Sequence, residues 1–239
     1  AEITKYAANS FLATKISFMN DLSAYCEKTG ADIEKIRHGI GADSRIGKKF
    51  LFAGIGYGGS CFPKDVMALL HSTEEAGTSL AVVRAAYEVN NRQIVRFTNK
   101  IIKRFDGNIK AKVFALWGLA FKHNTDDTRE APAFRIIDIL LDKGAKVVAY
   151  DPEAIENTRL RYGDKIQYVE SMYDAPKGAD ALLIATEWNV FRNPDFDKIR
   201  DEMKEPLIFD GRNLYDLDEM EKIGFEYYCV GRRAVNPKK

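Results

Sequence analysis

Short apolar runs alternate with helical segments through the second half of the chain, and this alternation constrains the fold more than any other feature. The runs cover residues 112–118, 145–152, 180–186, 206–211 and 225–231. Apolar strands separated by helices form a parallel sheet that helices cover on both faces. We therefore predict a doubly wound α/β domain over residues 107–239, with ligands at the carboxyl ends of its strands.

Residues 1–106 have the spacing of packed helices instead. The first helix is predicted to end at Gly30, and a long helix is predicted from about Leu80 to Arg104. In the long helix, apolar positions recur at alternating steps of four and three, which is typical of a packed seam. Such a helix can belong to the core of one bundle or form the spine of a dimer or of an interdomain contact. The predicted fold class is α + α/β, an all-helical domain followed by a parallel-sheet domain.

Composition and charge exclude several classes of protein. The 239 residues are 46% hydrophobic with a net charge of +1, which argues against a disordered chain and against binding nucleic acid by bulk charge. No apolar run approaches the ~18 to 20 residues that a membrane span needs. Three scattered cysteines are too few for a secreted disulfide scaffold and indicate a reducing, cytoplasmic setting. The cysteines and three lone histidines lack metal-ligand spacing, so no metal is expected.

A glycine-rich loop at residues 54–65 carries the strongest chemical signal. Four glycines within its first six positions allow the backbone to approach a ligand closely. Pro63 suits the first turn of a helix, so Cys61 is expected at the positive end of a helix dipole with Lys64 nearby. Both charges favour a thiolate, which is a candidate nucleophile, whereas the alternative is an inert buried cysteine beside a turn. Asp65 in the same first turn could orient a water or an amine.

Two helical polar residues are a second candidate. Lys5 and Asn9 are four residues apart and therefore share one face of the first helix. A lysine and an amide that point the same way could stabilise an oxyanion, or they could be an ordinary solvated stripe.

Cations at the predicted strand ends are a third candidate. Lys122 and Arg129 bracket a loop between a strand and a helix, and Arg212 follows another strand. Helix N-termini attract anions, so two cations there favour a phosphate-binding corner. Asp126 and Asp127 in that loop could suggest magnesium, but capping the helix and pairing with the cations is the favoured interpretation.

Taken in their order along the chain, these motifs resemble those of the UDP-glucose/GDP-mannose dehydrogenase family, whose members are nucleotide-sugar dehydrogenases. The resemblance is carried by residues 5–21, 45–65, 118–130, 186–188 and 209–213. The most specific of these motifs is the run GGSCFPKD at residues 58–65. The segments span nearly the whole chain, and their order is that of the family.

The resemblance implies a three-part, NAD-dependent oxidoreductase. It implies an amino-terminal NAD-binding Rossmann domain, a helical central domain that dimerises, and a Rossmann-like domain that binds UDP. Residues 1–106 and 107–239 are similar to the second and third parts, so the NAD-binding domain is expected to be absent and the chain alone inactive. The implied reaction is four-electron oxidation of UDP-glucose to UDP-glucuronate. GDP-mannose oxidation, or an inactive nucleotide-sugar-binding or dimerisation fragment, is the alternative. The expected partner is a second copy, with neither nucleic acid nor membrane.

The family's motifs also imply residue roles. Cys61 is the implied nucleophile; Lys5 and Asn9 stabilise oxyanions and hold a water, and Asp65 aids proton transfer. The implied substrate-binding residues are Lys5, Asn9, Arg45, Phe52, Ala53, Gly54, Ile55, Gly56, Tyr57, Gly58, Phe121, Lys122 and Arg212. Lys64 and Arg129 match residues that touch NAD, and Arg45 matches an arginine that reaches the neighbouring subunit's substrate.

Overall fold

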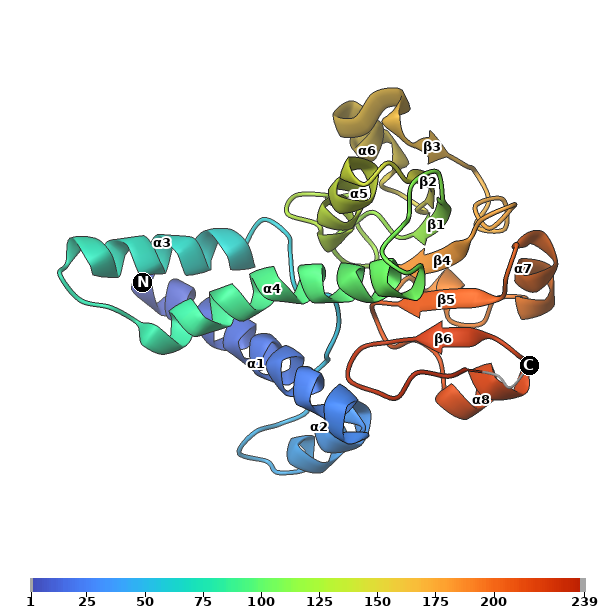
Figure 1. Cartoon of the computed structure of the whole chain (residues 1–239). Coiled ribbons are helices and arrows are strands. Elements are labelled where there is room, and N and C mark those ends of the chain that lie inside the picture. Colours follow the sequence, from blue (N-terminus) through green and yellow to red (C-terminus); the bar gives the residue numbers. More distant parts are fainter. Residues whose placement is uncertain (1, 237–239) are drawn as a thin grey trace.

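A computed structural model describes residues 2–236, in which a lobe of helices lies beside a lobe built on a sheet (Figure 1). The helices of the first lobe are α1 (Glu2–Thr29), α2 (Ile33–Gly41), α3 (Phe62–Glu75) and α4 (Ala81–Arg104). Figure 1 shows α4 running from the helical lobe to the edge of the sheet lobe. Its 24 residues, at about 1.5 Å each, make a rod long enough to join the two lobes.

Local sequence explains where these helices begin and end. Gly30 follows α1 with φ +76°, a left-handed conformation that stops a helix at little cost for glycine. The Asp32 side chain caps α2 by accepting a hydrogen bond from the backbone of Glu34. The predicted seam of α4 is confirmed at its centre, where Ile94 and Phe97 are buried.

The second lobe is a six-stranded parallel sheet in the order β3-β2-β1-β4-β5-β6. Its strands are β1 (Val113–Trp117), β2 (Lys146–Tyr150), β3 (Gln167–Tyr168), β4 (Ala181–Ile184), β5 (Leu207–Asp210) and β6 (Glu226–Tyr228). The helices between them are α5 (Pro132–Asp142), α6 (Ile155–Tyr162), α7 (Phe196–Glu202) and α8 (Leu217–Lys222), with short 3₁₀ turns at Gly163–Lys165 and Asn189–Phe191. The order reverses beside β1, which is the doubly wound, Rossmann-like arrangement. The predicted fold class is confirmed.

Strand β3 has no counterpart in the sequence prediction. Only two residues pair with β2, and a run this short carries no recognisable alternation. The five longer strands coincide with the five apolar runs. The central strands β1, β4 and β5 are buried on both faces, whereas β2 and β6 are fully buried on one face only. Within residues 2–236, no helix has the length and apolar content needed to cross a membrane.

One buried carboxylate organises the carboxyl edge of the sheet. Asp151 follows β2, is 1% exposed, and accepts hydrogen bonds from the backbone N–H groups of Leu119 (2.6 Å) and Ala120 (3.1 Å). It also accepts from the indole N–H of Trp188 at 3.1 Å. Because a buried carboxylate needs several donors, Asp151 draws the loops after β1 and β4 together.

The two lobes meet at an ion cluster at the far end of α1. One oxygen of Glu27 accepts hydrogen bonds from Lys100 Nζ (2.6 Å) and from the Gly231 N–H (2.8 Å), and the other lies 2.6 Å from Arg96 Nη2. Lys100 also donates to the Cys229 carbonyl at 2.7 Å. Burial by itself would raise the pKa of Glu27, but the two cations and the backbone donor hold that pKa below its usual value. Burial lowers the pKa of Lys100, and Glu27 opposes that shift. The cluster ties α1 and α4 to the loop after β6.

The substitution Glu27→Gln is expected to lower the free energy of unfolding by about 2 kcal/mol at pH 7, because it leaves Lys100 and Arg96 half-buried without a counter-charge. Glu27 has a lower pKa folded than unfolded, so its contribution is complete above the unfolded value, near 4.5, and is lost as the pH falls through the folded value. Urea titrations at pH 7 and pH 3 measure the difference. Glu156→Gln, in an exposed pair, is the control. If Glu27→Gln lowered the free energy of unfolding equally at both pH values, the ionised carboxylate of Glu27 would not be the source of the stabilisation.

Candidate active site

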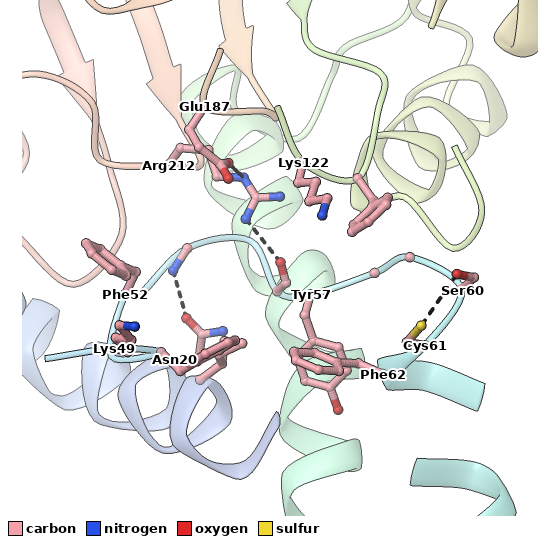
Figure 2. Close-up of a pocket in the computed structure, with 17 residues that line it drawn as sticks. Asn20, Lys49, Phe52, Tyr57, Ser60, Cys61, Phe62, Lys122, Glu187 and Arg212 are labelled. Atoms are coloured by element: carbon pink, nitrogen blue, oxygen red, sulfur yellow. Dashed lines mark hydrogen bonds and ion pairs between the residues drawn. The ribbon is translucent and has the colours of Figure 1, made fainter. Parts of the chain in front are cut away.

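A cavity of about 630 Å³ lies between the helical lobe and the carboxyl edge of the sheet (Figure 2). Residues from α1, the glycine-rich loop, the start of α3 and the loops after β1, β4 and β5 line it. They are Ile16, Asn20, Lys49, Phe50, Phe52, Gly54, Gly56, Tyr57, Gly58, Gly59, Ser60, Cys61, Phe62, Phe121, Lys122, Glu187 and Arg212. Strand ends of a doubly wound sheet are where ligands are expected, and the cavity opens there.

Two of the loop glycines are required by close packing. A Cβ on Gly56, which has φ +105°, would lie 2.8 Å from Asn90 Oδ1. A Cβ on Gly58 would lie 2.0 Å from the backbone oxygen of Glu130, a distance no side chain can adopt. The loop therefore threads between α4 and the sheet lobe with no room for side chains at these positions.

Backbone hydrogen bonds join the loop to the sheet lobe. The Ile55 N–H donates to the Gly211 carbonyl after β5 at 2.9 Å, and the Gly59 N–H donates to the Arg129 carbonyl at 2.9 Å. Figure 2 shows the guanidinium of Arg212 pointing at the loop, where Nη1 donates to the Gly56 carbonyl at 3.2 Å. The loop is thus a shared wall that belongs to both lobes.

Cys61 precedes the first residue of α3 and has an exposed thiol that lines the cavity. Its Sγ lies 3.7 Å from the hydroxyl of Ser60, as Figure 2 shows. Cys26 and Cys229 are buried, and burial raises the pKa of Cys229 to about 12. Of the three cysteines, only Cys61 has the exposure that a nucleophile needs.

A buried carboxylate gathers the two polar residues of α1. Asp65 is 2% exposed and accepts a hydrogen bond from Asn9 Nδ2 at 2.6 Å, and Lys5 Nζ lies 3.2 Å from it. Asp65 is one turn after Cys61, whose carbonyl accepts its N–H. Lys5, Asn9 and Asp65 therefore form one cluster beside the cavity, although none of them is among the residues that line it.

Arg212 is held in place from behind by a carboxylate. Its Nε donates to the Ala185 carbonyl at 2.7 Å and lies 3.2 Å from Glu187 Oε2, and His123 Nδ1 lies 3.5 Å from the other oxygen of Glu187. Burial would raise the pKa of Glu187, but Arg212 and His123 hold that pKa below its usual value. Among residues 2–236, Arg212 Nη2 has no hydrogen-bond partner. With Lys122 in the same wall, this arrangement can bind an anion such as a diphosphate.

A second cavity, of about 510 Å³, shares Tyr57, Gly59 and Ser60 with the first. Lys64 and Arg129, the two residues that the sequence assigned to NAD, line this second cavity and not the first. Arg129 also pairs with Asp127 at 2.7 Å, which matches the favoured interpretation of that aspartate. The other residues lining it are Pro63, Met67, Tyr87, Asn90, Asn91, Ile94, Glu130 and Arg135.

Some residues assigned from the sequence lie outside both cavities. Ala53 and Ile55 are buried among apolar neighbours, and Arg45 is 86% exposed and pairs with Asp43. The resemblance assigned no role to several residues that do line the first cavity: Ile16, Asn20, Lys49, Phe50, Gly59, Ser60, Phe62 and Glu187. For Glu187, the signal was present in the Thr-Glu-Trp run after β4. Asn20 also lies in a segment that carries the resemblance, residues 5–21, but no local pattern marks it as a residue that contacts the loop.

Sequence comparisons identify two parts of one family. The central domain of the UDP-glucose/GDP-mannose dehydrogenase family matches residues 1–92, and the UDP binding domain of that family matches residues 115–217.

Individual relatives agree with this match. The chain is 48% identical over 237 residues to a UDP-glucose 6-dehydrogenase of Pseudomonas aeruginosa, covering 97% of this chain and 52% of the relative. It is 47% identical over 235 residues to the UDP-glucose 6-dehydrogenase TuaD of Bacillus subtilis, covering 98% and 51%. A solved structure of a UDP-glucose dehydrogenase from the archaeon Pyrobaculum islandicum superposes with a TM-score of 0.86 at 33% identity, covering 97% of this chain and 51% of that one.

The chain spans about half the length of the curated relatives it matches. The two family matches together account for most of the chain. The central domain matches the helical lobe, and the UDP binding domain matches the sheet lobe. The resemblance is confirmed: this chain belongs to the UDP-glucose/GDP-mannose dehydrogenase family, with the central domain and the UDP binding domain of that family.

Proposed function

We propose that this chain is the thiol-bearing and nucleotide-sugar-binding portion of an NAD-dependent enzyme that oxidises UDP-glucose to UDP-glucuronate. The observation that carries the proposal is one cavity that contains an exposed thiol, Cys61, together with two cations, Lys122 and Arg212. The thiol suits the chemistry at the sugar, and the cations suit the diphosphate. The relatives named above are UDP-glucose 6-dehydrogenases, which supports UDP-glucose over GDP-mannose.

In the proposed reaction, the C6 hydroxyl of the glucose gives its proton to the water beside Asp65 and a hydride to the first NAD, and so becomes an aldehyde. The Cys61 thiolate adds to the aldehyde carbon, and Lys5 and Asn9 donate hydrogen bonds to the oxyanion that forms. Loss of a second hydride gives a thioester. A water positioned by Asp65 then breaks the carbon–sulfur bond and releases the acid and the thiol. Asp65 suits this role because its carboxylate already holds both Lys5 and Asn9.

Each NAD molecule, when bound, accepts one hydride, so the four-electron oxidation uses two NAD molecules in turn. The second cavity fits a ligand with phosphate groups, because Lys64, Arg129 and Arg135 supply three cations there against one carboxylate, Glu130. We propose that Lys64 and Arg129 contact NAD. All three cysteines are free, which supports the proposed reducing, cytoplasmic setting.

Two measurements test the proposal: the affinity for UDP-glucose, and the protection of the Cys61 thiol from alkylation by bound UDP-glucose. Calorimetry is expected to show that UDP-glucose binds this chain at least tenfold more tightly than GDP-mannose. Saturating UDP-glucose is expected to slow alkylation of Cys61 by iodoacetamide, because both occupy one cavity. Cys61→Ala is expected to leave the Kd for UDP-glucose within about twofold, and Arg212→Met to weaken it at least tenfold. In a protein of the relatives' length, Cys61→Ala is expected to abolish uronate formation.

Three outcomes would contradict the proposed function. The first is tighter binding of GDP-mannose than of UDP-glucose, with NADH formed only from GDP-mannose. The second is alkylation of Cys61 at an unchanged rate in saturating UDP-glucose. The third is robust uronate production by the Cys61→Ala variant, which would exclude a thioester. Leu160→Ala, at an exposed side chain on α6, is the control for nonspecific effects.

We also propose that two copies of the chain associate through α1. Ile3, Phe11, Phe18 and Tyr25 are 74%, 67%, 58% and 65% exposed on this helix, and the last three are seven residues apart. A seven-residue apolar repeat on an exposed helix face is typical of helix pairing. On α4, which the sequence suggested as a dimer spine, the centre of the apolar seam is turned into the core instead.

The proposed domain limits remain residues 1–106 for the helical domain and 107–239 for the sheet domain.

Phe18→Asp is expected to convert the dimer to monomer, because it places a charge at the centre of the apolar stripe. Sedimentation equilibrium at micromolar concentration measures the mass. Leu160→Asp is the matched control, since Leu160 is 87% exposed but lies on α6 of the sheet lobe. A wild-type chain that is monomeric, or a Phe18→Asp variant that remains dimeric, would show that α1 is not the interface.

A further inference from the structure

Three buried amide side chains hold the backbone of the glycine-rich loop. Asn90 of α4 accepts a hydrogen bond from the Tyr57 N–H at 2.9 Å and donates to the Tyr57 carbonyl at 3.1 Å. Gln93, one turn along α4, donates to the Gly54 carbonyl at 2.7 Å. Asn20 of α1 accepts from the Gly54 N–H at 2.8 Å. The chemistry proposed above assigns no part to any of these three residues.

The contact of Asn90 is the most specific of the three. A single amide satisfies both polar groups of one loop residue, as a neighbouring strand would in a sheet. Asn90 is 6% exposed and Tyr57 is 8% exposed, so water has little access to replace either bond. The loop fits this amide closely, because a Cβ on Gly56 would lie 2.8 Å from Asn90 Oδ1. Removal of the side chain would leave two backbone groups unsatisfied in a nearly dry site.

The residues held in this way are part of the cavity wall. Gly54, Gly56, Tyr57 and Gly58 all line the cavity of about 630 Å³, and Cys61, three residues after Gly58, lines it too. A binding loop that is already ordered loses less conformational freedom when its ligand arrives. The free backbone of a loop with four glycines among residues 54–59 would otherwise sample many conformations.

We propose that Asn90 is a positioning residue, which fixes the glycine-rich loop in its ligand-binding conformation before the nucleotide sugar binds. Gln93 and Asn20 hold Gly54, three residues earlier in the same wall. Asn90 acts through the backbone of Tyr57 and is not among the residues that line the first cavity. The proposal rests on the proposed function only in naming the ligand of the cavity as a nucleotide sugar.

Hydrogen exchange in the ligand-free chain tests whether Asn90 holds the backbone of Tyr57 in place. The Asn90→Ala variant is expected to exchange the Tyr57 amide at least tenfold faster than the wild type, with strands β1 and β4 unchanged. Thr98→Ala is the matched control. Thr98 is equally buried on α4, but its hydroxyl donates only to the Ile94 carbonyl of its own helix. This control is expected to change Tyr57 exchange by less than twofold.

Calorimetry tests the consequence for binding. Asn90→Ala is expected to raise the Kd for UDP-glucose at least tenfold, and Thr98→Ala less than twofold. Asn90→Asp keeps the size of the side chain and the acceptor for the Tyr57 N–H, but replaces the donor with a carboxylate oxygen. Its Kd is expected to be at least as high as that of Asn90→Ala, because the buried carboxylate would face the Tyr57 carbonyl without a partner. Because Asn90→Asp is isosteric, it also serves if Asn90→Ala fails to fold.

The outcomes separate the two proposals. Faster Tyr57 exchange together with weaker UDP-glucose binding in Asn90→Ala supports the positioning role. Unchanged exchange, or faster exchange with a wild-type Kd, overturns it. An equal loss of binding in Thr98→Ala also overturns it, because general packing of α4 would then be the cause. A wild-type chain that binds no UDP-glucose contradicts the proposed function, while Tyr57 exchange still decides whether Asn90 holds the loop.

Discussion

The packing of a glycine-rich backbone between two lobes is the constraint on which the site depends. The loop at residues 54–59 has no side chain at four positions, and its carbonyls and N–H groups are bonded to α1, α4 and the strand-end loops instead. Neither lobe makes this wall alone. Because the bonds come from both sides, the loop fixes the position of Cys61 relative to the cations at the sheet edge.

The cations in turn depend on buried carboxylates. Glu187 holds Arg212 from behind, and Asp151 holds the loops after β1 and β4 that carry Lys122 and Glu187. Buried charge is costly unless it is paired. Asp151 is accordingly surrounded by hydrogen-bond donors, and the half-buried Glu187 is paired with Arg212 and His123. The result is a cavity whose positive groups are preorganised, and whose thiol is supplied by the opposite lobe.

The sequence alone was sufficient for most of the fold. The five apolar runs and the seam of α4 predicted five of the strands and the long helix, because apolar runs bounded by turn residues and a fixed helical period are local patterns. The two-residue strand β3 left no such pattern. The loop glycines and Cys61 were also recognisable, since close backbone approach and a helix start each require particular residue types.

What the sequence could not determine is which distant groups meet. Nothing local marks Asn90 as the partner of Tyr57, or Asn20 as the partner of Gly54, because both amides look like ordinary polar positions on apolar helices. Nor does local sequence separate the residues of the first cavity from Lys64 and Arg129 in the second. The chain by itself determined its helices, most of its strands and the place of its candidate nucleophile, because propensity, periodicity and charge are local. Only the tertiary structure decided which polar groups are buried together, because the burial that forces each one to find a partner exists only after the two lobes have packed.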